Sequence, residues 1–400
     1  MSPRAALNID DLRRIAQRRL PRVAWEFLER GTEDETTLVE NRAAFERLRF
    51  QPRTLVDVSQ RTQQVTLFGK THAAPFGVAP TGAAGLYSFE ADIALARAAA
   101  RAGVPFVLST ASFVELERVA RAADGSKWFQ LYMSKDRDAA RALVERARDA
   151  GYEALVVTTD VPVGGNREYN RRNKFEVPFH LDLGNAVDGL MHPHWLVNVF
   201  MRTLLTSGVP RFRNTDVGGQ IVARNLLEFR ARREALDWSD FAWLREFWSR
   251  KLLLKGVLTV EDALLAAQHG ADGLFVSNHG ARQLDGAPSP LTALPAIADA
   301  VGRRLTIMLD GGVRRGSDIV KALALGARMV FVGRAALYGA SAGGEPGVVR
   351  ALDILKSEVD RVMALIGCPA VVALDARYLA LPDSGTHCRR STVHALESDF

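Results

Sequence analysis

The chain has 400 residues, 48% of them hydrophobic, and a formal net charge of +6. This composition is typical of a globular protein with a large core, and no run of about 18 apolar residues predicts a helix that spans a membrane. The Lys and Arg residues are spread along the chain, which argues against a nucleic-acid-binding surface. Two cysteines, Cys368 and Cys388, are too few for a disulfide framework and fit a reducing cytoplasm, and the N-terminus lacks the pattern of a signal peptide.

The first predicted elements are helices over about residues 8–50, where NIDDLRRIAQRRL has the pattern of a capped helix start. Eight short apolar runs follow, and amphipathic helix patterns separate them. The runs cover residues 75–80, 105–110, 127–133, 154–160, 252–256, 273–279, 306–312 and 329–334. Buried strands that alternate with helices predict a parallel sheet, and eight such units predict a closed (β/α)8 barrel. An open doubly wound sheet is the alternative, although no GxGxxG motif follows the first strand.

The chain is predicted to form a single domain over residues 1–400, with one long insertion. Roughly ninety residues, about 161–251, separate the fourth and fifth strands, far more than a normal loop of this kind contains. This insertion is therefore expected to be a lid, an interaction segment, or both.

Within the insertion, residues 191–213 mix apolar and aromatic side chains with Arg202, Arg211 and Arg213. One interpretation is a helix and lid that pack on the barrel, or a contact between subunits. The other is an interfacial membrane segment, because the stretch is too short and too polar to span a bilayer. His192 and His194 have no further ligands nearby, so no metal site is expected.

Polar or glycine residues follow every predicted strand, at the barrel face where such folds place their chemistry. These residues are Pro80, Thr81, Gly82, Ser109, Gln130, Tyr132, Thr158, Asp160, Lys255, Ser277, His279, Arg282, Asp310, Gly311, Gly312, Val313, Arg314, Gly333 and Arg334. Eight polar strand ends that converge on one face indicate an active site more than a solvated rim.

Several motifs resemble the FMN-dependent α-hydroxy-acid oxidases and dehydrogenases over about residues 7–379. The motifs are LLLKG, SNHGARQLD, LDGGVRRGSDIVKALALGA and GRAALYG, while LVDVSQR, PTG, FVLSTAS, WFQLY and DRVMALIGCP are most like the (S)-mandelate and L-lactate dehydrogenase branch. The resemblance implies FMN-dependent oxidation of an (S)-2-hydroxy acid, aromatic as in mandelate, to the 2-oxo acid, with a quinone or other carrier as electron acceptor. It also implies a homotetramer in the cytoplasm, peripheral on the inner face of the cell membrane if residues 191–213 bind lipid.

Three alternatives stay open within this resemblance. The chain could be an L-lactate dehydrogenase, or an oxidase that makes peroxide from a 2-hydroxy acid. It could also bind FMN without catalysis.

Two groups of residues are expected to bind the cofactor. The loops after the last two strands lie where barrels usually bind phosphate, and their glycines and arginines suit an anion; they contribute Asp310, Gly311, Gly312, Arg314, Gly333 and Arg334. For the flavin ring, the resemblance implies Ser109, Gln130, Thr158, Ser277 and the backbone of Pro80, Thr81 and Gly82. Lys255 ends a buried strand and needs a negative partner there, which the charge on reduced flavin would supply.

The resemblance implies that Arg167 and Arg282 clamp the substrate carboxylate, since an arginine fork pairs with both oxygens. Tyr132 donates a further hydrogen bond, His279 acts as the base, and Asp160 orients the imidazole. An unperturbed histidine pKa near 6.5 suits proton abstraction at neutral pH. Whether the substrate carbon loses a proton or a hydride is left open.

Three positions bear on the choice of substrate and acceptor. Phe27 stands where the family has a tyrosine that reaches the substrate carboxylate, so one contact of the clamp is missing. Ala111 replaces the tryptophan of glycolate oxidases and leaves room for an aromatic substrate. Gly82 is typical of mandelate-type dehydrogenases, whereas oxidases more often have alanine there, which favours an acceptor other than O2.

Overall fold

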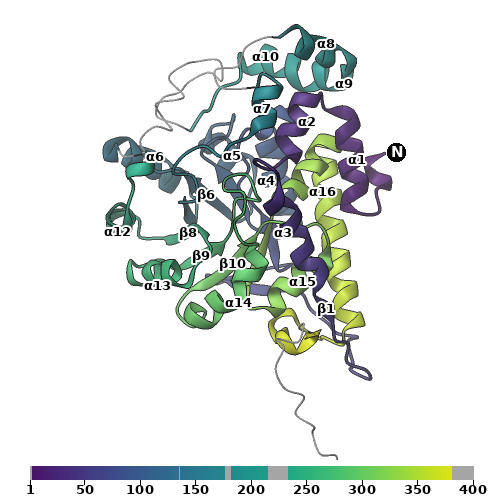
Figure 1. Ribbon diagram of the computed structural model, residues 1–400, viewed down its shortest axis with the longest axis vertical. Coiled ribbons are helices and arrows are strands. Elements are labelled where there is room, and N and C mark those ends of the chain that lie inside the picture. The colour runs from purple at the N-terminus through teal and green to yellow at the C-terminus, as the bar shows by residue number, and fades with distance from the viewer. Residues whose placement is uncertain (1, 135, 176–181, 215–232, 381–400) are drawn as a thin grey trace, which may run out of the picture.

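A computed structural model describes residues 2–134, 136–175, 182–214 and 233–380, and it confirms the predicted barrel (Figure 1). Eight parallel strands close in the order β10-β11-β4-β5-β6-β7-β8-β9. They are β4 (Phe76–Val78), β5 (Phe106–Ser109), β6 (Lys127–Leu131), β7 (Ala154–Thr158), β8 (Lys251–Val257), β9 (Gly273–Val276), β10 (Thr306–Asp310) and β11 (Met329–Val332). Each lies within one of the eight apolar runs or overlaps it almost completely, so the alternative open sheet is excluded.

A helix connects each strand to the next around the outside of the barrel. These helices are α4 (Ala91–Ala102), α5 (Leu116–Ala122), α6 (Arg137–Asp149), α12 (Trp238–Phe247), α13 (Val260–Gln268), α14 (Pro290–Val301), α15 (Gly316–Ala324) and α16 (Arg334–Leu365). A short 3₁₀ helix, η2 (Ala84–Leu86), precedes α4. The long α16 is broken at Gly343 and Gly344, whose backbone dihedrals are not helical.

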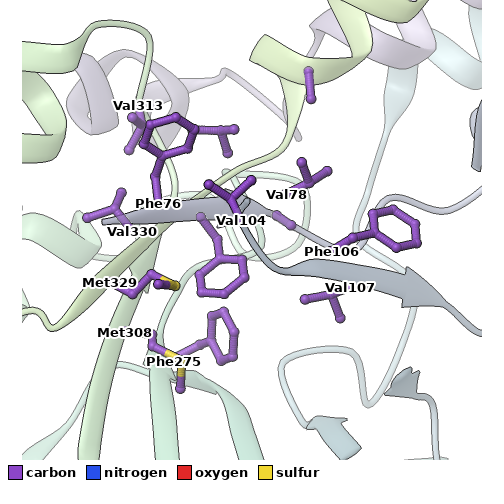
Figure 2. Packing of buried hydrophobic residues seen from close by; sticks show 14 of the residues in the cluster. Phe76, Val78, Val104, Phe106, Val107, Phe275, Met308, Val313, Met329 and Val330 are labelled. Atoms are coloured by element: carbon purple, nitrogen blue, oxygen red, sulfur yellow. The ribbon is translucent and has the colours of Figure 1, made fainter. Parts of the chain in front are cut away.

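The barrel strands are buried on both faces, which explains their continuous apolar sequences. Figure 2 shows Phe76, Phe275, Met308 and Met329 in this core, contributed by β4, β9, β10 and β11, and all four are 0% exposed. The barrel interior is therefore a packed core, and any ligand site has to lie at the strand ends.

The predicted N-terminal helices are present as α1 (Ile9–Arg19), α2 (Arg22–Glu29) and α3 (Thr36–Arg47). Asn8 caps α1, since its side-chain oxygen accepts a hydrogen bond from the backbone N–H of Asp11 at 2.8 Å. Figure 1 shows α1 and α2 beside the upper part of α16, which is the half that follows β11.

Two small antiparallel sheets were not predicted. One is the hairpin of β2 (Val65–Leu67) and β3 (Lys70–His72), and the other pairs β1 (Arg49–Phe50) with β12 (Leu379–Ala380). The second sheet joins two parts of the chain that are far apart in sequence.

The insertion runs from the end of β7 to the start of β8, although residues 176–181 and 215–232 of it lie outside the described residues. It contains α7 (Glu168–Arg172), α8 (Leu183–Met191), α9 (Pro193–Trp195), a π-helical turn η3 (Leu196–Met201), α10 (Arg202–Ser207) and a 3₁₀ turn η4 (Arg233–Ala235). Figure 1 shows α8, α9 and α10 together at the upper end of the molecule.

The inner side of this helical group packs on the barrel. The indole N–H of Trp195 donates to the backbone carbonyl of Leu86 at 2.7 Å, and the Arg202 guanidinium lies 4.2 Å from the ring centroid of Phe89. The interpretation of residues 191–213 as helices that pack on the barrel therefore agrees with the contacts.

Candidate active site

One cavity of about 760 Å³ opens at the carboxyl ends of the barrel strands, a volume within the range of small-molecule and cofactor sites. Residues predicted from separate parts of the sequence line it together: Phe27, Pro80, Thr81, Gly82, Ala111, Gln130, Tyr132, Thr158, Arg167, Lys255, His279, Arg282, Asp310, Gly311, Gly312, Arg314, Gly333 and Arg334. The three other predicted site residues, Ser109, Asp160 and Ser277, do not line it. They lie behind the wall and hold residues that do.

His279 and Asp160 form a close pair at the ends of β9 and β7. The Nδ1 atom of His279 lies 2.7 Å from the carboxylate of Asp160, and the Tyr132 hydroxyl lies 3.4 Å from Nε2. Three successive residues, His279, Gly280 and Ala281, have left-handed φ angles of 57°, 65° and 62°. For His279 and Ala281, which are not glycine, this conformation is strained, and such strain is typical of functional loops.

The protonation states suit a base. Burial lowers the pKa of His279 below its ordinary value, because the opposite effect of Asp160 is smaller. Burial alone would raise the pKa of Asp160, but His279 and Lys255 together bring it below its ordinary value. At neutral pH the pair is therefore a neutral imidazole beside a carboxylate, and the hydrogen bond at Nδ1 leaves Nε2 free to accept a proton.

Lys255 is buried at the end of β8 and has the negative partners that its position requires. Its ammonium lies 3.3 Å from the carboxylate of Asp310, 3.7 Å from that of Asp160, and 2.8 Å from the hydroxyl of Ser277. Burial opposes the charge, but the two carboxylates raise the pKa of Lys255 above its ordinary value. Gly256 permits this arrangement, since an added Cβ would lie 2.7 Å from that of Asp160. The Asp310 side chain is thus placed to position Lys255, and only its backbone continues into the glycine loop.

Buried polar groups without partners test whether a flavin fits. The hydroxyl of Ser109 donates to Oε1 of Gln130 at 2.9 Å, which turns the amide nitrogen of Gln130 the other way. That nitrogen and the hydroxyl of Thr158 are both buried and have no hydrogen-bond partner among the described residues. Native proteins rarely leave such groups unpaired. They suit the carbonyls and ring nitrogens of an isoalloxazine, so the residues present fit FMN.

The phosphate end of the cavity is cationic. Gly311 and Gly312 have positive φ angles of 101° and 78° and bring the backbone close to the cavity, and the N-terminus of α16 lies at the same place. Burial, together with Arg282 and Arg314, lowers the pKa of Arg334 to about 10. Arg334 also donates to three backbone carbonyls. Arginines this close together favour a bound anion such as the FMN phosphate.

The two arginines of the predicted carboxylate clamp both pack against Phe27. The guanidinium carbon of Arg282 is 5.0 Å, and that of Arg167 5.9 Å, from the centroid of the phenyl ring. Arg167 also donates to the backbone carbonyl of Arg282 and to the side-chain oxygen of Gln283. Gly165 allows this close approach, because an added Cβ would lie 2.6 Å from the Arg282 carbonyl oxygen. The predicted position of the N-terminal segment over the site therefore agrees with the geometry.

Sequence reasoning missed several cavity residues. Arg233, from the insertion, lies with its guanidinium carbon 4.3 Å from the ring centroid of Tyr132. Phe113 and Phe212 form an aromatic pair, with centroids 5.4 Å apart, that lines the cavity beyond Ala111. Tyr87 lines it as well and is 3% exposed. None of these residues lies in a motif whose spacing would mark it.

The catalytic loop is also tied to the N-terminal helices. Asp285, at the end of the SNHGARQLD motif, caps α3, because its carboxylate accepts hydrogen bonds from the backbone N–H groups of Thr36 and Thr37. The buried amides of Asn41 and Asn278 exchange two hydrogen bonds, of 3.0 and 2.8 Å. Part of the motif therefore serves to hold the loop rather than to react.

Comparisons with known proteins agree with this site. The family model described as FMN-dependent dehydrogenase matches residues 16–381. The chain is 44% identical to (S)-mandelate dehydrogenase of Pseudomonas putida over 374 residues, which cover 93% of each protein. It is 42% identical to L-lactate oxidase of Nostoc sp. over 383 residues, 94% of this chain and 98% of that one.

A solved structure gives the same result for the fold. The crystal structure of the monotopic membrane protein (S)-mandelate dehydrogenase superposes with a TM-score of 0.88 at 43% identity, over 94% of this chain and 99% of that chain. Together with the cationic phosphate end and the unpaired groups that fit a flavin, these matches show that the chain belongs to the family of FMN-dependent dehydrogenases.

Proposed function

We propose that this protein oxidises an (S)-2-hydroxy acid with an aromatic side chain to the 2-oxo acid and passes the electrons to a quinone or a similar carrier. The observation that carries the proposal is that His279, held from behind by Asp160, and the two clamp arginines line one cavity that also fits FMN. A base, a carboxylate clamp and a flavin are the three parts that such an oxidation needs.

Each of these residues has a separate role in the proposed reaction. Arg167 and Arg282 hold the substrate carboxylate, which fixes the orientation of the reacting carbon relative to His279. Nε2 of His279 accepts a proton from the substrate, and Asp160 stabilises the imidazolium that results. FMN, when bound, supplies the acceptor for two electrons. Lys255 keeps its charge at the strand end, where a negative charge on the cofactor would be stabilised.

The apolar wall of the cavity supports an aromatic substrate. Ala111 has only a methyl group where it lines the cavity, and this methyl packs next to Gly82, 3.0 Å from where a Cβ added to Gly82 would lie. Leu86, Phe113 and Phe212 line the cavity in the same region. A phenyl ring would bury its surface against these side chains, whereas a methyl group would leave much of the space empty.

The test is anaerobic addition of (S)-mandelate, L-lactate and other 2-hydroxy acids to the FMN-loaded protein, followed by the flavin absorbance. Bleaching is expected with mandelate at a higher rate than with lactate. A faster reaction with lactate would show that lactate, not mandelate, is the preferred substrate. An unchanged spectrum with every acid would show that the protein binds FMN without catalysing the oxidation.

The electron acceptor has its own test. Gly82, in the PTG motif, supports a dehydrogenase, and we expect reoxidation by a soluble quinone to be at least ten times faster than by dissolved O2. Peroxide formed in proportion to substrate would instead establish an oxidase.

We also propose that the insertion docks on an anionic membrane surface, such as the inner face of the cell membrane. No described helix is long and apolar enough to cross a bilayer. However, α8, η3, α10 and the residue stretch that follows them expose many large apolar side chains: Leu183, Val187, Leu190, Met191, Val197, Met201, Leu205 and Val209. Eight of the fifteen exposed large hydrophobic side chains in the described parts of the chain lie here, which is typical of an interaction surface. One similar solved structure is of a monotopic membrane protein.

Flotation with vesicles tests the membrane proposal. Leu190 and Leu205 are 67% and 83% exposed, and replacing both by Ser should release the protein from vesicles rich in anionic lipid. Leu365→Ser, at a residue 69% exposed near the end of α16, is the matched control and should leave binding intact. High salt should weaken the attraction. Equal flotation of all three proteins, or none with the wild type, would contradict the proposal.

We propose a homotetramer as the assembly, on the resemblance to the family alone. Light scattering should then give about four times the chain mass of 43.8 kDa, and a monomeric mass would exclude this assembly.

A further inference from the structure

The carboxylate clamp lacks one hydrogen-bond donor, and another residue of the cavity wall can supply it. Phe27 packs against the guanidinium groups of both Arg167 and Arg282, and its phenyl ring offers no hydrogen bond to an anion that they hold. A carboxylate has about four lone-pair sites, so two arginines leave room for a further donor. The question is which other group of the cavity wall can reach the same anion.

Tyr87 is the phenol that the fold places at this end of the cavity. It lines the cavity and is 3% exposed, and its hydroxyl has no hydrogen-bond partner among the described residues. Of the charged groups that act on it, Arg282 acts most strongly, and Arg167 and Arg334 act on it as well. A hydroxyl without a partner among the described residues, on a side chain that lines the same cavity as both clamp arginines, is suited to a ligand that those arginines also bind.

The backbone around Tyr87 is fixed rather than free to swing. The N–H of Ala83 donates to the carbonyl of Ala111 at 2.7 Å, and Ala83 has a left-handed φ of 55°. The carbonyl of Leu86 accepts the indole N–H of Trp195 from the insertion. Burial raises the pKa of Tyr87, so the phenol remains protonated and can donate at neutral pH.

The other phenols near the site are placed differently. Tyr132 lies on the side of the base, with its hydroxyl 3.4 Å from Nε2 of His279. Tyr169 follows the clamp residue Arg167 in α7, and its hydroxyl is buried without a partner in the described parts of the chain. However, Tyr169 does not line the cavity. Tyr87 is therefore the phenol with access to the clamped anion.

We propose that Tyr87 belongs to the carboxylate clamp and donates a hydrogen bond to the substrate carboxylate held by Arg167 and Arg282. It supplies from the first βα loop the hydroxyl that position 27 lacks. The inference rests on the proposed function, because it takes the ligand of the clamp to be the carboxylate of a hydroxy acid.

The test measures binding without turnover. Phenylacetate has the carboxylate and ring of the proposed substrate but no hydroxyl to oxidise, and its binding to the FMN-loaded protein can be followed by calorimetry or by the change in flavin absorbance. A hydrogen bond to a charged group corresponds to a change of roughly ten- to a hundredfold in affinity. Tyr87→Phe should weaken phenylacetate binding by that factor. Phenylacetamide, which carries no charge, should change by less than about threefold, because bonds between neutral groups are weaker.

Two variants keep the test specific. Tyr169→Phe removes the neighbouring buried hydroxyl and should bind phenylacetate within twofold of the wild type. Phe27→Tyr, added to Tyr87→Phe, places a phenol next to the two arginines and should restore most of the affinity. Both changes conserve the ring, so FMN content and melting temperature should stay close to those of the wild type.

The outcomes separate this inference from the proposed function. If Tyr87→Phe binds phenylacetate as tightly as the wild type, or if Tyr169→Phe causes the loss instead, the inference is wrong even though mandelate still bleaches the flavin. If no hydroxy acid bleaches the wild type but Tyr87→Phe loses phenylacetate binding, the proposed oxidation fails and the anion-binding role of Tyr87 stands.

Discussion

Replacing Asp160 by Asn tests the pairing on which the proposed chemistry depends. The substitution keeps the size of the side chain, and the amide oxygen can still accept the N–H of His279 at Nδ1. Only the negative charge is lost. Lys255 keeps its second carboxylate partner, Asp310, at 3.3 Å, so we expect the variant to fold and bind FMN.

The size of the effect follows from the 2.7 Å contact between side chains that are 20% and 11% exposed. A hydrogen bond to a charged group exceeds one between neutral groups by about 1–1.5 kcal/mol, which sets the lower limit. Two unit charges about 4 Å apart attract by roughly 4 kcal/mol at an effective dielectric constant of about 20, which sets the upper limit. Because each 1.36 kcal/mol is tenfold in rate, flavin reduction should slow by roughly tenfold to a thousandfold.

The pH dependence gives a second, independent signal. The proton is accepted only by neutral His279, so the reduction rate should fall as the pH drops through the pKa of that residue. Burial lowers this pKa, and Asp160 works in the opposite direction. Removing the charge of Asp160 should therefore move the acid limb to still lower pH.

Anaerobic stopped-flow reduction by mandelate, measured across the acid range, gives both quantities. Asp310→Asn is the control, since Asp310 contacts Lys255 but is not a partner of His279, and it should leave the acid limb where it is. A loss of less than threefold in Asp160→Asn, with an unshifted limb, would show that the pair does not carry the proton transfer.

Three further predictions concern the same cavity. His279→Gln should retain FMN and stability but reduce flavin slower by at least about a hundredfold; retention of more than a tenth of the wild-type rate would exclude His279 as the base. Ala111→Trp should fill the space beside Gly82 and weaken mandelate binding by at least about tenfold while lactate binding changes little, and an equal effect on both acids would argue against an aromatic pocket. Gly165→Ala forces a Cβ to within 2.6 Å of the Arg282 carbonyl, so thermal unfolding should show a loss of about 1–3 kcal/mol together with weaker carboxylate binding; an unchanged melting temperature would contradict this packing argument.

The barrel could be predicted because its strands are buried on both faces. The sequences of β9, GLFV, and β10, TIMLD, have three consecutive apolar residues each and are followed or ended by polar ones, which is a strong local signal. The small sheets could not be predicted for the opposite reason. β1 and β12 contain two residues each and pair across more than three hundred residues, so neither local composition nor spacing reveals them.

Some residues of the candidate site could likewise be predicted from the sequence, and others could not. His279 and Arg282 could be predicted because they lie in a recognisable motif directly after a barrel strand. The carboxyl ends of parallel strands all lie at one face of a barrel, so these residues were expected there. Tyr87 and Arg233 reach that face through an irregular loop and a long insertion, where position depends on tertiary contacts. The same motif also contains Asp285, which caps α3 and does not line the cavity, a role that the motif alone does not reveal.

The two hydrogen bonds between the side-chain amides of Asn41 and Asn278 limit how far this chain can be shortened or circularly permuted. His279 and Ala281, which follow Asn278, have left-handed backbones, and a conformation of this kind in residues other than glycine persists only while its surroundings enforce it. Part of those surroundings, Asn41 in α3, belongs to the first fifty residues of the chain. A shortened protein that starts at the first barrel strand would keep all eight strands and still lose the geometry of its base. The N-terminal helices are therefore not an optional extension of the barrel. Circular permutants in which α3 no longer packs on the loop after β9 should fold but should not oxidise a hydroxy acid.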